Sequence, residues 1–225
     1  MDTSSLALRP LHPHNMSAAI FDFDGTLADT AALWHEVDRQ FFQRRGMVCD
    51  PDYAQRLATL GFADGARYTI DRYGLAESVE DVCAEWRNAS ERLYKTSVTL
   101  RPGAREYLLR LRAHGVPCAL ATTNTASVLD SMEHVNVREL FCERVYGSEV
   151  SRSKNHPDIY LEAARRLGVD PHMCIVFEDI APALRAAQRA GMTACGVRAN
   201  DASQPVGTLR ATADLWLDDW RDLAE

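Results

Sequence analysis

Short apolar runs alternate along the chain with stretches in which apolar residues recur at helical spacing. The runs cover residues 18–21, 116–122, 144–147, 173–177, 192–197 and 213–217. A short apolar run that ends at a glycine or at polar residues is typical of a buried strand, whereas apolar residues three or four positions apart indicate a helix. Strands that alternate with helices of about ten residues predict an α/β fold with a doubly wound, Rossmann-like parallel sheet.

One long block interrupts this alternation. Apolar residues recur at helical spacing from Leu33 onwards, and helical patterns without a convincing strand continue to about residue 96, with breaks at 61–65 and 73–74. A helical block inserted after the first strand of a sheet predicts a small second domain. The predicted boundaries are an all-helical cap at 31–98 and a Rossmann-like core at 17–30 and 99–225.

The first sixteen residues differ from the rest of the chain. They contain two prolines and several polar residues, and they lack the basic start and the long apolar segment of a signal peptide. We therefore predict a flexible N-terminal tail over residues 1–16, with Met16 as an alternative natural start.

Composition excludes some classes of protein. The 225 residues are 46% hydrophobic, which suffices for a large core, and the net charge of −7 comes without any basic stripe that would favour nucleic acid. No apolar run approaches the ~20 residues of a membrane span. Six cysteines show no CxxC pair, and Cys118, Cys174 and Cys195 lie in apolar runs as expected for buried free thiols. These features favour a reducing, cytoplasmic setting, with a monomer as the default expectation.

The first apolar run ends at two carboxylates. Asp22 and Asp24 lie two positions apart, so they leave an extended chain on the same side, and Gly25 then breaks the run. Parallel sheets bind ligands beyond the carboxyl ends of their strands. Carboxylates this close repel unless a cation intervenes, and Mg²⁺ is the usual ion held by oxygen ligands. One acid can then attack phosphorus while the other moves a proton, although a DxD pattern alone is more often a solvated acidic turn.

Polar residues also follow later apolar segments. Thr122, Thr123 and Asn124 close the second run, where they can bind phosphate oxygens or simply cap the next helix. Lys154 precedes a helix that begins at a proline. Its ammonium group can neutralise a phosphate and hold a carboxylate, or it can be an ordinary solvated lysine.

A second acid pair, Glu178 and Asp179, ends another buried run. Because neighbouring strand residues face opposite ways, one acid can bind a metal directly and the other through water, or the pair can begin the next helix. Right-handed crossovers place the carboxyl ends of all parallel strands at one edge of the sheet. We therefore expect the polar ends of three strands to meet there.

Four motifs occur along the chain in the same order as the motifs of the haloacid dehalogenase superfamily and resemble them. The chain is similar to the branch in which a helical cap follows the first strand, which includes beta-phosphoglucomutases and phosphoglycolate phosphatases. The first motif matches DFDGTLADT, the second ALATT, the third SKNHPDIY and the fourth FED at 177–179. The resemblance covers residues 18 to about 200.

The resemblance implies a role for each matching residue. Asp22 would be the nucleophile that forms an aspartyl-phosphate, and Asp24 would be the general acid/base. Thr122 would bind phosphate, or Thr123 if the register differs by one, with Asn124 beside them. Lys154 would stabilise the charge that develops during transfer.

The same resemblance implies a Mg²⁺ site. Asp179 would bind the ion with help from Glu178, and Asp22 and the backbone carbonyl of Asp24 would contribute. Dehalogenases of this superfamily lack the second acid of the first motif, so Asp24 indicates a phosphoryl substrate. The implied partner is a small phosphorylated metabolite.

The cap departs from the mutase pattern. Trp34, Leu60 and Asp64 stand where beta-phosphoglucomutases carry catalytic or phosphate-binding basic residues, and an acid there would repel a second phosphate. We therefore expect a phosphatase acting on a small phosphate monoester such as a sugar phosphate, with a phosphosugar mutase as the alternative. Phe62 and Trp34 either face the substrate or pack at the seam between cap and core, and Asp64 would bind hydroxyl groups.

The third and fourth motifs also show departures. Ile180 and Ala183 replace the usual hydroxyl residue and glycine of the fourth motif, and Asn155 replaces the usual proline after the motif lysine. Loss of a hydroxyl near a metal site changes the orientation of its ligands. We expect altered metal affinity or loop conformation, and a third hypothesis is an inactive phosphate-binding module.

Overall fold

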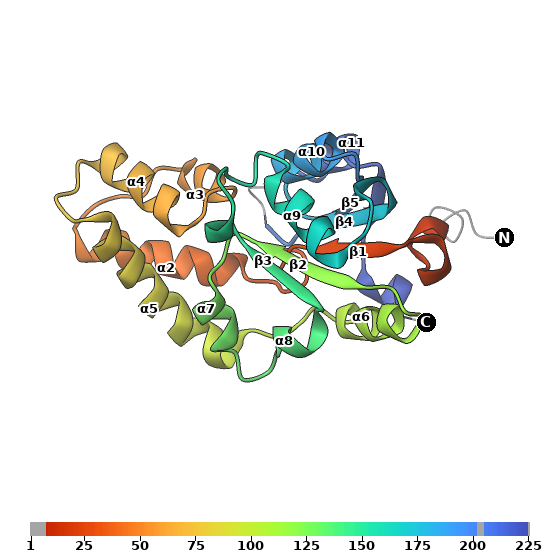
Figure 1. Ribbon diagram of the computed structural model, residues 1–225. Helices are drawn as coiled ribbons and strands as arrows, with labels where there is room; N and C mark the ends of the chain where they lie inside the picture. The colour runs from red at the N-terminus through yellow and green to blue at the C-terminus, as the bar shows by residue number, and fades with distance from the viewer. Residues whose placement is uncertain (1–7, 202–204, 225) are drawn as a thin grey trace.

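The computed structural model describes residues 8–201 and 205–224. A sheet forms its centre (Figure 1). Its strands are β1 (Ala18–Phe21), β2 (Cys118–Thr122), β3 (Glu143–Tyr146), β4 (Cys174–Glu178), β5 (Thr193–Val197) and β6 (Leu215–Leu217). They lie in the order β3-β2-β1-β4-β5-β6, and every neighbouring pair is parallel. The predicted doubly wound parallel sheet is confirmed.

Helices cover both faces of this sheet (Figure 1). One face carries α6 (Ala104–Ala113), α7 (Ala126–Asp130), α8 (Val137–Leu140) and η5 (Trp220–Leu223). The other face carries α9 (Asp158–Leu167), α10 (Ala181–Arg189) and α11 (Val206–Thr212). Short 3-10 helices complete the core at η1 (Arg9–Leu11), η2 (Pro13–Asn15), η3 (Gly147–Glu149) and η4 (Pro171–Met173).

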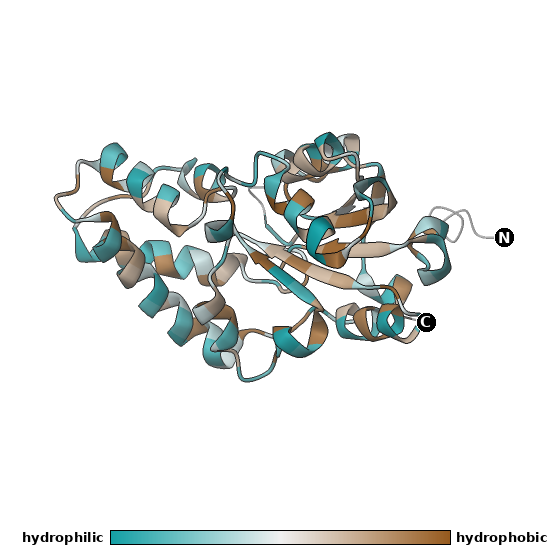
Figure 2. Cartoon of the chain, viewed as in Figure 1, coloured by the Kyte–Doolittle hydropathy of each residue, from teal (hydrophilic) through white to brown (hydrophobic). Residues whose placement is uncertain are grey.

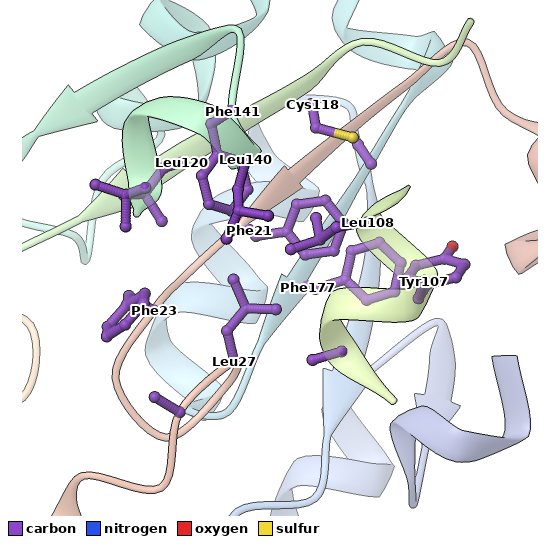
Figure 3. Packing of buried hydrophobic residues seen from close by; sticks show 14 of the residues in the cluster. Phe21, Phe23, Leu27, Tyr107, Leu108, Cys118, Leu120, Leu140, Phe141 and Phe177 are labelled. Carbon is purple, nitrogen blue, oxygen red and sulfur yellow. The ribbon is translucent and has the colours of Figure 1, made fainter. Parts of the chain in front are cut away.

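Alternation along each strand divides the core into two layers. Ala19 and Phe21 of β1 pack toward α6, whereas Ala18 and Ile20 pack toward α9 and α10. Phe21 stacks on Phe177 of β4 at 4.6 Å between ring centroids, in the packed layer that Figure 3 shows. Burying each large apolar side chain stabilises the fold by about 1.5–3 kcal/mol. This packing holds the ends of the strands, and the residues that follow them, in fixed positions.

A helical insert follows β1 and has its own core. It comprises α2 (Ala31–Arg44), α3 (Tyr53–Leu57), α4 (Phe62–Tyr73) and α5 (Val79–Ser97). Their apolar faces meet around Val37, Phe41 and Trp86, while polar residues cover the outer faces (Figure 2). The insert extends from one end of the sheet (Figure 1).

Three details differ from the pattern that the sequence predicts. Helix α4 begins at Phe62, so Gly65 lies inside a helix, where an added Cβ would touch Trp86 at 3.4 Å. Between β2 and β3, two short helices, α7 and α8, take the place of one helix of about ten residues. The expected flexible tail is wrong for residues 8–16, because Leu11 is fully buried in the core and its carbonyl accepts a hydrogen bond from Tyr107 Oη at 2.7 Å. Residues 1–7 lie outside the described part.

The three cysteines expected to be buried thiols are buried, and all six cysteines are free. Within residues 8–201 and 205–224, no helix combines the length and apolar character needed to cross a membrane.

Candidate functional site

The site forms where β1 and β4 end side by side. Phe21 pairs with Phe177 in the parallel register, so Asp22 and Glu178, which follow them, lie at the same height. Gly25 turns the chain after β1 with φ of +82°, and a Cβ added there would collide with the Asp179 carboxylate. The turn thus needs glycine both for its conformation and for room.

A buried charge cluster occupies this edge of the sheet. Lys154 Nζ pairs with Asp22 Oδ1, and it lies 2.6 Å from Glu178 Oε1. Tyr160 Oη donates a hydrogen bond to Glu178 Oε1 at 2.7 Å. Lys154 is 3% exposed and Asp22 is 6% exposed. The interpretations of Asp22 as part of a solvated turn and of Lys154 as a solvated loop residue are therefore wrong.

The cluster contains more negative than positive charge. Burial, together with the nearby carboxylates, raises the pKa of Asp22 and of Asp179 well above the ordinary range, and the Lys154 ammonium opposes this only in part. Burial alone would lower the pKa of Lys154, but its two ion pairs outweigh burial and raise it. Lys154 therefore stays charged, and the carboxylates need a further cation to be ionised together.

The same carboxylates fit a divalent cation. One oxygen each from Asp22, Glu178 and Asp179 lies within 4.8 Å of the others. Glu178 Oε2 is buried and has no hydrogen-bond partner among the described residues, which is costly unless a ligand satisfies it. Thr26 Oγ1 donates to Asp179 Oδ1 at 3.2 Å, so a hydroxyl does orient this carboxylate although Ile180 supplies none. Oxygen ligands in this number suit Mg²⁺ or a similar hard ion.

Asp24 lies beside this cluster, and its side chain has other partners. Its Oδ1 accepts hydrogen bonds from Thr30 Oγ1 at 2.7 Å, from Trp34 Nε1 at 3.4 Å and from Tyr94 Oη. Its Oδ2 accepts from Asn124 Nδ2 at 3.0 Å. The donors come from the helical insert as well as from the core, so the position of this carboxylate depends on both parts. Its side chain is not among the three that cluster as possible metal ligands.

The second motif divides into two kinds of residue. Thr122 is buried at the end of β2, and its Oγ1 accepts a hydrogen bond from the Asn124 backbone at 3.1 Å. Thr123 and Asn124 line a cavity between the core and the helical insert, whereas Thr122 does not. The hydroxyl available to a ligand is therefore that of Thr123, and the expected role of Thr122 fits its position less well.

The loop that carries Lys154 is tied to the insert. The Lys154 backbone N–H donates to the Thr59 carbonyl at 3.0 Å, and Asn155 Nδ2 donates to Thr59 Oγ1 at 2.8 Å. Asn155, which departs from the family pattern, thus joins the insert to the lysine loop. A proline here has no polar side-chain atom and would lose this second bond.

A cavity of about 180 Å³ lies between the core and the insert. Its core end is lined by Asp22, Asp24, Thr123, Asn124, Lys154, Glu178 and Asp179. Its cap end is lined mainly by aromatic and aliphatic side chains of the insert, including Trp34, Leu57, Leu60, Phe62 and Trp86, with His35 and Asp38 as ionisable neighbours. Trp34 and Phe62 also pack on each other, with ring centroids 5.9 Å apart, and both contact the apolar clusters of the core and of the insert, as expected at the seam; their contact with substrate stays a prediction.

The sequence predicts Asp64 as the acid at the cap end of the cavity, and this prediction is wrong. Asp64 lies in the first turn of α4, is exposed and pairs with Arg67, and it does not line the cavity. Asp38 of α2 lines it instead. Sequence reasoning also missed Tyr94 and Trp86. The helical periodicity of α5 marks both only as core residues, because nothing in it shows which partner their polar atoms meet.

The chain is similar to known proteins over most of its length. The haloacid dehalogenase-like hydrolase family matches residues 19–197. A probable pseudouridine-5'-phosphatase of Drosophila melanogaster is 34% identical over 180 residues, covering 77% of this chain and 78% of that protein. A phosphorylated carbohydrates phosphatase of Thermotoga maritima is 29% identical over 178 residues, covering 79% of this chain and 82% of that protein.

A solved structure gives the same picture of the fold. A mutant of CbbY from Rhodobacter sphaeroides, in complex with xylulose-(1,5)bisphosphate, superposes with a TM-score of 0.78 at 25% identity, covering 92% of this chain and 95% of that one. The family match extends from β1 to β5 and includes all four motifs. The chain therefore belongs to the haloacid dehalogenase-like hydrolase family of enzymes.

Proposed function

We propose that the protein is a Mg²⁺-dependent phosphatase that hydrolyses a small phosphate monoester through an aspartyl-phosphate on Asp22. The observation that carries the proposal is the convergence of Asp22, Glu178 and Asp179 at the floor of a cavity that also contains Asp24 and Lys154. The names of the relatives from Drosophila and Thermotoga, both phosphatases, support the same class of reaction.

In the first step, the Asp22 carboxylate attacks the phosphorus of the bound ester. Its Oδ1 is held by Lys154, so Oδ2 is the freer oxygen for attack. The bond between phosphorus and the leaving oxygen breaks, and Asp24 in its protonated form gives that oxygen a proton. The products of this step are the free alcohol and the acyl phosphate on Asp22.

In the second step, water attacks the phosphorus of the acyl phosphate. Asp24, now a carboxylate, takes a proton from that water, and the bond from phosphorus to Asp22 breaks. Inorganic phosphate leaves and both acids return to their starting forms. The four donors around Asp24 hold its side chain in one position for both steps.

Positive charge at the floor of the cavity supports both steps. Lys154 stabilises the charge that builds on the transferring group, and Thr123 and Asn124, which line the cavity, bind phosphate oxygens. Asp22, Glu178 and Asp179 would hold the metal ion, which when bound supplies further positive charge for the nucleophile and the phosphoryl oxygens.

Phosphate release tests the proposal. We expect wild-type protein to release phosphate from acetyl phosphate or an aryl phosphate with Mg²⁺, to lose activity with EDTA and to regain it when Mg²⁺ is restored. Asp22→Asn should retain the fold and show only background release. Equal background rates for wild type and Asp22→Asn would overturn the proposal, and phosphate binding without turnover would identify the inactive binding module instead.

A further inference from the structure

The turn that follows β1 packs directly against the carboxylate of Asp179. A Cβ added to Gly25 would collide with this carboxylate, so the backbone of the turn leaves it no room on that side. Thr26, the next residue, is fully buried, and its Oγ1 donates a hydrogen bond to Asp179 Oδ1 at 3.2 Å. The position of the turn therefore determines where the two carboxylate oxygens of Asp179 lie.

Two side chains from distant parts of the chain hold the backbone carbonyls of this turn. Trp220 of η5 donates a hydrogen bond from Nε1 to the Thr26 carbonyl at 3.0 Å. Arg101, which lies shortly before α6, donates from Nη1 to the Gly25 carbonyl at 3.1 Å and to the Thr26 carbonyl at 3.4 Å. Because a buried carbonyl without a partner is costly, these donors favour one position of the turn.

Close packing fixes the position of the Trp220 indole. The residue is 1% exposed, and its ring contacts Phe177 at 5.3 Å, Tyr107 at 5.6 Å and Phe21 at 6.0 Å between centroids. Figure 3 shows these three partners in the apolar layer beside β1 and β4. The Nε1 donor cannot turn away from Thr26 without disrupting this layer.

We propose that Trp220 and Arg101 are positioning residues for the candidate metal ligand Asp179. They hold the Thr26 backbone, and the Thr26 hydroxyl in turn keeps the Asp179 carboxylate oriented toward the ion. Trp220 does not line the cavity, and it lies beyond residues 19–197, which match the family. The inference rests on the metal site of the proposed function, and it assigns part of the metal affinity to the C-terminal segment.

Direct metal binding tests this role without any use of catalysis. Mn²⁺ binds the same kinds of oxygen ligand as Mg²⁺, and its free concentration can be measured by electron paramagnetic resonance. We would titrate wild-type protein and Trp220→Phe, a change that keeps an aromatic ring and removes the N–H. Arg101 still donates to the Thr26 carbonyl in this variant, so we expect the Kd for Mn²⁺ to rise about fivefold, less than the roughly 10–100-fold caused by loss of a direct partner of a metal ligand.

Tyr107→Phe is the matched control for Trp220→Phe. Tyr107 packs on Trp220 in the same apolar layer, and its Oη also donates to a backbone carbonyl, that of Leu11, at 2.7 Å. This variant should lose stability, as Trp220→Phe should, but keep the wild-type Kd for Mn²⁺. An unchanged Kd in Trp220→Phe, or an equal rise in both variants, would contradict the proposal.

Thr26→Val tests whether Trp220 acts through Thr26. Valine keeps the backbone carbonyl and the shape of the side chain but removes the hydroxyl that binds Asp179. We expect this change alone to raise the Kd for Mn²⁺ about tenfold. Adding Trp220→Phe should then raise the Kd by less than about twofold, because the path to Asp179 is already broken. A full fivefold addition would contradict the proposal, since independent effects multiply.

Arg101→Met tests the same turn without changing the aromatic packing, and so serves even if Trp220→Phe does not fold. It removes the donor to the Gly25 and Thr26 carbonyls, and we expect a several-fold rise in the Kd for Mn²⁺. An unchanged Kd would count against the inference. Wild-type protein that binds no Mn²⁺ would refute the metal site of the proposed function itself, whereas binding that these variants leave unchanged refutes only the positioning role.

Discussion

The two ends of the cavity are built on different principles. At the core end, buried charged groups hold one another in ion pairs and hydrogen bonds, and the acids among them lie at the ends of β1 and β4. At the cap end, apolar side chains from helices surround the few polar groups, and among the described residues Trp86 Nε1 and the Asp38 carboxyl have no hydrogen-bond partner. The charged groups of the core end are thus paired with one another, apart from the Glu178 oxygen that a cation could bind, whereas the cap end is mainly apolar.

This difference separates chemistry from recognition. Strand ends in a packed sheet hold side chains rigidly, which phosphoryl transfer needs. The helical insert can vary at the cap end, although Thr59 bonds it to the Lys154 loop and Tyr94 bonds it to Asp24. Asp24 is the exception, because donors from both parts hold it.

The largest effect is expected from Lys154→Met at the core end. The change leaves Asp22 and Glu178 buried without their counter-ion, so we expect the free energy of unfolding to fall by about 3–5 kcal/mol and kcat to fall about a thousandfold. Denaturant unfolding and phosphate release measure the two effects. Lys95→Met is the control, since Lys95 is the other lysine of the chain and forms only an exposed pair with Glu133 at 3.8 Å. Equal losses of stability and of kcat in both variants would show that the buried ion pairs of Lys154 are not needed for either.

Tyr94→Phe tests whether the helical insert positions Asp24. It removes one donor to Asp24 while keeping the ring that packs on Trp34, with centroids 6.0 Å apart. We expect kcat to fall about tenfold with little change in KM, because the acid/base group is less well positioned. Tyr107→Phe loses a comparable buried hydrogen bond, to the Leu11 carbonyl, and should lower stability by about 1 kcal/mol without changing kcat. A normal kcat in Tyr94→Phe would mean that the insert does not position Asp24.

The smallest effect concerns the stability of the cap end and its dependence on pH. Burial raises the folded-state pKa of Asp38 from 3.8 to about 7, so the folded state binds this proton more tightly than the unfolded state. The free energy of unfolding should therefore fall as pH rises from about 4 to about 7. Asp38→Asn removes this loss, so it should stabilise the protein by about 1–3 kcal/mol at pH 8 and hardly at all at pH 4.

Denaturant unfolding at the two pH values measures this difference. Asp64→Asn provides the comparison, because the exposed pair with Arg67 should contribute little at either pH. A stability change in Asp38→Asn that is the same at pH 4 and pH 8 would show that its carboxyl is not shifted by burial.

The sequence predicted the core end better than the cap end for a physical reason. Apolar runs that stop at Asp22 and Glu178 identify strand ends directly, and the parallel register brings those ends together. The order of the strands was not predicted, but the meeting of their polar ends needed only a parallel sheet. At Thr122 and Thr123 the prediction was less certain, because a one-residue shift moves a side chain to the other face of a strand.

The cap end depends on how helices rotate against each other, which short patterns do not determine. Asp64 was expected there because it lies close to the Gly61 loop in sequence, but the helix starts at Phe62 and turns this acid toward Arg67 and solvent. Asp38 and Trp86 lie 48 residues apart and meet one cavity through the packing of α2 on α5. Leu11 was missed for a similar reason, since a single apolar residue among prolines has no periodicity.

Trapping phosphorylated Asp22 tests the central claim most directly. Wild-type protein would be mixed with acetyl phosphate and Mg²⁺, quenched in acid and digested, and the peptide that contains Asp22 would be analysed by mass spectrometry. We predict that this peptide gains the mass of one phosphoryl group, that hydroxylamine removes it and that Asp22→Asn never acquires it. Turnover without any label on this peptide, or a label that persists in Asp22→Asn, would contradict the account.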